Sequence, residues 1–75
     1  MRARRKRMIR LRVRELAEAR KITRTQLSRR AEVNYDTING IWQNPQRAVS
    51  LAVLVRIARV LDVAVTDLYE DIPDE

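Results

Sequence analysis

Hydrophobic positions recur every three or four residues along most of this 75-residue chain, a spacing typical of helices that pack on one face. The clearest example follows Ser50, a residue type that caps helices, and consists of Leu51, Leu54, Val55, Ala58 and Leu61. We expect a helix that begins just after Ser50 and buries this stripe in the core. A short fifth helix over residues 65–69 is expected to follow it.

A capping signal marks the start of a shorter helix upstream. Thr23 and Gln26 stand three positions apart, so the Thr23 hydroxyl can accept the Gln26 amide while the Gln26 side chain accepts the Thr23 amide. This capping box predicts a helix over residues 24–31, which Glu32 and Val33 interrupt.

The next segment has two interpretations. Asn34 is a good N-cap, and a helix over residues 35–43 would place on one face the apolar residues Ile38, Ile41 and Trp42. Alternatively, Asn39-Gly40 forms the turn of a β-hairpin. The residues on either side of this pair do not alternate between apolar and polar, which favours the helix.

The N-terminal segment also leaves two interpretations open. Residues 8–13 alternate between apolar and basic side chains, as a β-strand does, before a helical stretch over residues 13–20. A strand needs a partner, and residues 68–72 offer strand-forming side chains with acids that would face the arginines. In the alternative, a helix begins near Met8 after a basic tail.

Several of these segments together resemble a known family. The similarity rests on the segment 22–38, on Asn44-Pro45, and on the closing pattern Ile57-Ala58-x-x-Leu61-x-Val63-x-x-x-Asp67-Leu68. These features resemble the Cro/cI-type helix-turn-helix domains of phage repressors and bacterial XRE-type regulators, and the likeness covers residues 13–69.

The resemblance implies an all-α, five-helix fold, to which a short terminal two-stranded β-ribbon is an open addition. It also implies that the second helix lies over the DNA backbone and that the third, about residues 35–43, enters the major groove. We divide the chain into a basic arm at residues 1–7, the DNA-binding domain at residues 8–72 and an acidic tail at residues 73–75.

The resemblance assigns residues to the two kinds of DNA contact. The positions expected at base edges are Tyr35, Asp36, Asn39 and Gly40. The positions expected at phosphates are Arg24, Asn34, Thr37, Gln43, Asn44 and Arg47. Gly40 stands where family members often carry a long polar base-reading side chain, so discrimination between sequences is either weak or dependent on Asn39 and DNA shape.

Two positions depart from the family pattern. Glu32 lies where the family usually has a glycine in the left-handed conformation, which would strain this residue by about 1–2 kcal/mol. Ala17 and Trp42 occupy the positions of a buried Arg and Glu pair, so we expect apolar packing there, with Trp42 in the core.

Charge is unevenly distributed along the chain. Sixteen Lys and Arg residues against ten Asp and Glu residues give a net charge of +6, which indicates a polyanionic partner. Residues 1–14 carry basic side chains and no acid, whereas residues 67–75 carry acids and no base. Arginine enrichment of this kind also arises from high-GC codon usage, and that explanation remains open.

The absence of cysteine and histidine argues against disulfides, the usual metal sites and most catalytic triads. We therefore expect no enzyme, no cofactor, no metal and no small-molecule ligand. The longest apolar stretch is too short to span a bilayer, so we expect a cytoplasmic protein with no membrane partner. The favoured function is a regulator that binds double-stranded DNA as a homodimer; the alternatives are an RNA-binding module and an antitoxin-like protein-interaction domain.

Overall fold

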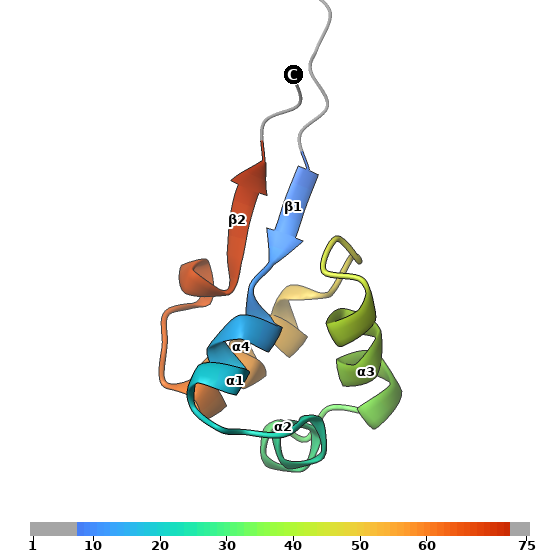
Figure 1. Cartoon of the computed structure of the whole chain (residues 1–75), viewed down its shortest axis with the longest axis vertical. Helices are drawn as coiled ribbons and strands as arrows, with labels where there is room; N and C mark the ends of the chain where they lie inside the picture. The colour runs from blue at the N-terminus through green and yellow to red at the C-terminus, as the bar shows by residue number, and fades with distance from the viewer. Residues whose placement is uncertain (1–7, 73–75) are drawn as a thin grey trace, which may run out of the picture.

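The computed structural model describes residues 8–72, and these form four α-helices, one 3-10 helix and two strands (Figure 1). In chain order the elements are β1 (Met8–Leu11), α1 (Val13–Ala19), α2 (Arg24–Ala31), α3 (Tyr35–Gln43), α4 (Leu51–Leu61), η1 (Val65–Leu68) and β2 (Tyr69–Ile72). The four α-helices gather at one end, and the two strands extend away from them as a ribbon. The basic arm and the acidic tail inferred from the sequence lie outside the described residues.

The ribbon confirms the strand interpretation of the N-terminal segment. Strands β1 and β2 pair antiparallel with Met8 opposite Ile72 and Leu11 opposite Tyr69. A helix beginning near Met8 is therefore wrong. As expected, an acid faces an arginine: Arg10 stands opposite Glu70 and donates a hydrogen bond to its carboxylate over 2.8 Å.

The expected all-α, five-helix fold needs a correction at its C-terminal end. The segment expected to form a fifth helix makes only the four-residue 3-10 helix η1. Tyr69 is already extended, because it enters the pairing with β1, so the helix cannot continue. The domain is therefore mostly helical, with four α-helices, one 3-10 helix and a small antiparallel sheet.

The structure confirms the three helix starts that the capping residues predicted. The Thr23–Gln26 capping box is present in both directions at the start of α2. The Asn34 side chain accepts the Asp36 amide at the start of α3, and the Ser50 hydroxyl accepts the Val53 amide at the start of α4. The hairpin interpretation is wrong, because the Asn39-Gly40 pair lies inside α3.

The core lies between the helices and is closed at one end by the ribbon. Its largest fully buried side chains are Leu27, Ile38, Ile41, Ile57, Leu61, Leu68 and Val13. The stripe expected on α4 is buried only in part. Leu54 and Ala58 are buried, but Val55 is half-buried and Leu51 is 67% exposed, because the buried arc of the helix is centred between Leu54 and Leu61.

The turn after α2 has the geometry expected from the family pattern. Glu32 adopts the left-handed conformation, with φ 58° and ψ 43°. Lys21 and Asp62 also have a φ of 58°, just after α1 and α4. Aspartate tolerates this conformation, whereas the lysine carries no local signal for it. None of the helices within residues 8–72 has the length and apolar content needed to cross a membrane.

Candidate nucleic-acid interface

The turn between α2 and α3 is held by two hydrogen bonds to its own backbone. The Ser28 hydroxyl donates to the Val33 carbonyl over 2.6 Å. The Arg56 guanidinium, from α4, donates to the Glu32 carbonyl over 3.1 Å. Helix α2 packs against both α3 and α4, and Figure 1 shows α2 end-on while α3 runs across it. The pair therefore forms a rigid helix-turn-helix unit that rests on α4.

One side of α3 faces away from the core. Ile38 and Ile41 are buried, and at 100° per residue the opposite side of the helix is centred on Asp36 and Gln43. We call this side the outer face; it consists of Tyr35, Asp36, Asn39, Gly40 and Gln43. Asn39 and Gly40 lie on opposite margins of the outer face, and Tyr35 is 42% exposed.

Arg24 lies against one margin of the outer face. Its guanidinium, at the first position of α2, donates from Nη1 to Oδ1 of Asn39 over 2.6 Å. The family resemblance assigned Arg24 to a phosphate and Asn39 to a base, and in the structure the two side chains are hydrogen-bonded to each other. While this bond is made, the Asn39 carbonyl oxygen has a donor and its amide NH₂ remains free to donate elsewhere.

Arg47 lies against the other margin. A methyl group at position 40 would overlap Nη1 of Arg47 and would lie 2.9 Å from its Cζ and 3.4 Å from its Cδ. The Arg47 side chain, which belongs to the loop between α3 and α4, therefore occupies the space that a side chain at Gly40 would take. The family resemblance assigned Arg47 to the DNA backbone, and the only sign of this contact in the sequence is a glycine inside a helix.

The remaining assigned residues are placed at the ends of α3. Asn34 Oδ1 accepts the Asp36 amide over 2.7 Å, so both residues stabilise the helix N-terminus. Thr37 is half-buried, and Gln43 is exposed in the last turn. Asn44 is the C-cap residue and accepts the Gln46 amide over 3.2 Å, which shapes the following loop.

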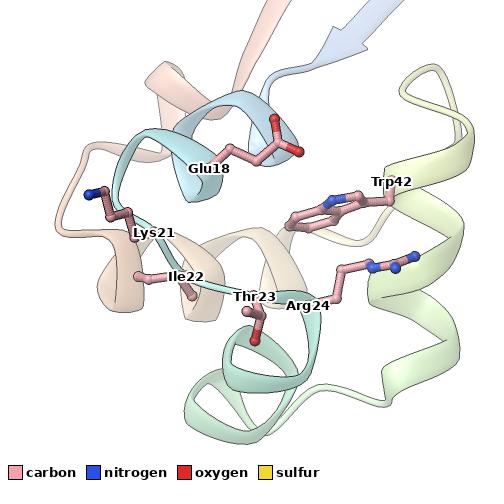
Figure 2. A pocket seen from close by; sticks show the side chains of 6 residues that line it. All are labelled: Glu18, Lys21, Ile22, Thr23, Arg24 and Trp42. Atoms are coloured by element: carbon pink, nitrogen blue, oxygen red, sulfur yellow. The ribbon is translucent and has the colours of Figure 1, made fainter.

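A pocket of about 480 Å³ opens beside the Arg24 margin and was not anticipated from the sequence. Its lining residues are Glu18, Lys21, Ile22, Thr23, Arg24 and Trp42. Figure 2 shows the Trp42 ring between the side chains of Glu18 and Arg24.

This pocket corrects the expectation that Trp42 belongs to the core. Ala17 is fully buried, but Trp42 is only half-buried and packs against the edge of the core. Helix α1 ends at Ala19, and the connection to α2 leaves one side of the large ring uncovered.

Arg10, in β1, and Arg14, in α1, have carboxylate partners. Arg10 contacts Glu15 over 3.3 Å as well as Glu70, and Arg14 pairs with Glu18 over 3.1 Å. Hydrogen bonds, first to Glu15 and then to Glu70, raise the pKa of the Arg10 guanidinium, which stays charged at every physiological pH. Within residues 8–72 the structure gives no carboxylate partner to Arg24 or Arg47.

Comparison with known proteins agrees with this geometry. A family model described as a Cro/C1-type HTH DNA-binding domain matches residues 12–74. The restriction-modification controller protein C.AhdI from Aeromonas hydrophila is similar in structure, with a TM-score of 0.67 and 27% identity over 75% of this chain and 83% of that chain. The transcriptional regulator VanUg has the same fold, with a TM-score of 0.72 and 23% identity over 91% of this chain and 89% of that chain. None of the curated proteins matches this chain significantly.

Proposed function

The chain belongs to the Cro/C1-type helix-turn-helix family of DNA-binding domains, and we propose that it regulates transcription by reading a specific double-stranded sequence. It is a binding module and not an enzyme. In this proposal the outer face of α3 enters the major groove while α2 lies over the backbone. The similar controller protein, at 27% identity, supports a regulatory role.

The observation that carries the proposal is the pair of arginines beside a polar helix face. Arg24 and Arg47 flank the outer face of α3 from opposite margins, and within the described residues neither has a carboxylate partner. Guanidinium groups in this state are available to the phosphates and base edges of DNA.

The contacts follow from position on this surface. We assign Tyr35, Asp36, Asn39 and Gly40 to base edges. We assign Arg24, Asn34, Thr37, Gln43, Asn44 and Arg47 to the sugar-phosphate backbone. The carboxylate of Asp36 is tolerated there because it stabilises the start of α3 and can accept from cytosine N4.

We further propose that two copies bind together on adjacent half-sites, as helix-turn-helix domains commonly require. The exposed side chain of Leu51, at the start of α4, is available to the contact between the copies. Sedimentation of the protein with and without duplex would give the stoichiometry directly. A single copy on a full-length site would contradict the dimer.

The experiment that tests the proposed function is fluorescence anisotropy on duplex DNA from the region upstream of the gene. Scrambled duplex and structured RNA serve as competitors, and the titration is repeated across a salt series. We expect binding that resists both competitors. Equal displacement by every competitor, with a steep salt dependence, would contradict a sequence-specific regulator; displacement by RNA alone would favour an RNA-binding module.

A further inference from the structure

A glycine at position 40 makes helix α3 less stable than an alanine would, so its presence calls for a structural reason. Glycine inside a helix is less favourable than alanine, because it loses more backbone freedom on folding. A positive φ is the usual reason to keep a glycine, yet Gly40 has no positive φ and lies within the regular helix α3. What glycine provides at this position is the space that its missing side chain leaves.

That space is occupied by the end of the Arg47 side chain. Nη1, Cζ and Cδ of Arg47 are the atoms that a methyl group at position 40 would meet. The guanidinium thus lies in a notch on the outer face, one residue along the helix from Asn39. Helix α3 itself contains no lysine or arginine, so this is positive charge brought to the helix from another segment.

The loop that carries Arg47 is tied to its surroundings. The Arg47 amide donates to the Asn44 carbonyl over 3.0 Å, and the Asn44 amide donates to the Gly40 carbonyl over 2.8 Å. The Pro45 carbonyl accepts the Leu11 amide over 2.6 Å, which fastens the loop to β1. The base of the Arg47 side chain is therefore fixed relative to α3.

The Arg24–Asn39 contact at the opposite margin of the outer face strengthens the case that Arg47 contacts a base. Arg24 donates to Asn39 Oδ1 and so occupies one of the two lone pairs of the oxygen that would accept from adenine in a bidentate pair. The Arg47 guanidinium has no carboxylate partner within residues 8–72 and keeps its donors available.

We propose that Arg47 is the base-reading residue at the Gly40 position and donates two hydrogen bonds to O6 and N7 of a guanine. The inference rests on the proposed function and changes the assignment of Arg47 from the backbone to a base. Gly40 has the supporting role: it makes the notch that holds the guanidinium on the outer face instead of touching a base through its own side chain.

Selection of bound sequences from a randomised duplex library tests the proposal. The wild-type protein, Arg47→Gln and the control Arg59→Gln, which removes an exposed arginine of α4, are compared. We expect Arg47→Gln to lose the preference for guanine at one base pair of each half-site, by roughly 5- to 150-fold, while the other positions keep theirs. Arg59→Gln should select the wild-type sequence.

A second variant tests the notch without removing the arginine. Gly40→Ala should raise the urea midpoint, because alanine favours the helix, and should displace the flexible guanidinium from the outer face. We expect the same guanine preference to weaken, and the double variant with Arg47→Gln to lose no more than Arg47→Gln alone. The raised midpoint shows that any loss of preference is not caused by unfolding.

Two outcomes overturn the claims separately. If Arg47→Gln binds all sequences more weakly and selects the wild-type sequence, Arg47 contacts a phosphate and the inference is wrong while the proposed function stands. If the wild-type protein selects no sequence at all, the proposed function is wrong and the inference is wrong with it.

Discussion

The arginines of the ribbon end and those of the α2–α3 end have different partners. Arg10, in β1, contacts the carboxylates of Glu15 and Glu70, and Arg14 contacts that of Glu18. At the other end, Arg24 contacts the neutral amide of Asn39 and Arg47 lies over Gly40. Arg10 and Arg14 thus have carboxylate partners, whereas the described residues give none to Arg24 or Arg47.

The comparison shows why net charge alone does not locate a binding surface. The sequence is richest in arginine before residue 15, which would place a polyanion at the N-terminal end. Within the described part of that end, Arg10 and Arg14 have carboxylates within 3.3 Å and Arg12 has none. The cationic surface that we propose for DNA is formed instead by two arginines well separated in sequence.

The largest effect should come from removing matched pairs of arginines from the two ends. Arg24→Gln with Arg47→Gln should weaken DNA binding about 10- to 100-fold at fixed salt, because contacts of this kind contribute about 1–3 kcal/mol at a base and less at a phosphate. Arg10→Gln with Arg14→Gln removes the same charge and should weaken binding less than about 3-fold.

Anisotropy titrations of both double variants on one duplex provide the measurement. Thermal unfolding of each variant checks that it is folded. Equal losses of affinity in the two variants would show that total charge, and not its partners, determines binding.

The next effect concerns the stability of the α2–α3 turn. Glu32→Gly should raise the free energy of unfolding by about 1 kcal/mol, because glycine relieves the left-handed strain but loses more freedom on folding. The urea midpoint measures this change. Asp62→Gly, at the same φ at the end of α4, is the comparison variant and should gain less, because aspartate tolerates the left-handed conformation better than glutamate. A lower midpoint for Glu32→Gly would mean that the turn is not strained.

A smaller effect is expected at the ribbon. Arg10→Ala and Glu70→Ala should each lower the urea midpoint only slightly, because the pair is exposed to solvent. A double-mutant cycle, repeated at high salt, should give a weak coupling that decreases with salt. A strong coupling that persists at high salt would show that the ribbon is essential to the fold.

The smallest effect is spectroscopic. Trp42 is the single tryptophan of the chain, so its emission reports only on the α2–α3 end. Since the ring is half-buried beside the pocket, acrylamide should quench it to an intermediate extent. Complete protection from acrylamide would place the ring in the core, as the sequence suggested.

The helices could be predicted because their signals are local. The capping residues Thr23, Asn34 and Ser50 each act on an amide two or three positions away, so the sequence alone locates the helix starts. The ribbon could be anticipated because each strand has a local signal: β1 alternates between apolar and basic residues, and β2 carries acidic residues. The length of the last helix could not be predicted, since it depends on where Tyr69 enters the sheet.

The candidate site was predicted in outline and not in detail. Resemblance placed Asn39, Gly40 and Arg47 near DNA, but the reach of the long arginine side chains across other elements depends on tertiary packing. Arg24, for example, contacts Asn39, which lies fifteen positions later in the sequence. The exposure of Trp42 likewise depends on how far α1 extends over it, which no local pattern records.

The most direct test is a titration of the isotope-labelled protein with duplex DNA, followed by the backbone amide chemical shifts. If the charged α2–α3 end binds DNA, the largest changes fall at Arg24, along α3 and at Arg47, and the amides of β1 and β2 move little. If the largest changes fall on β1 and β2 while α3 stays unchanged, the ribbon end binds DNA and the central claim is wrong.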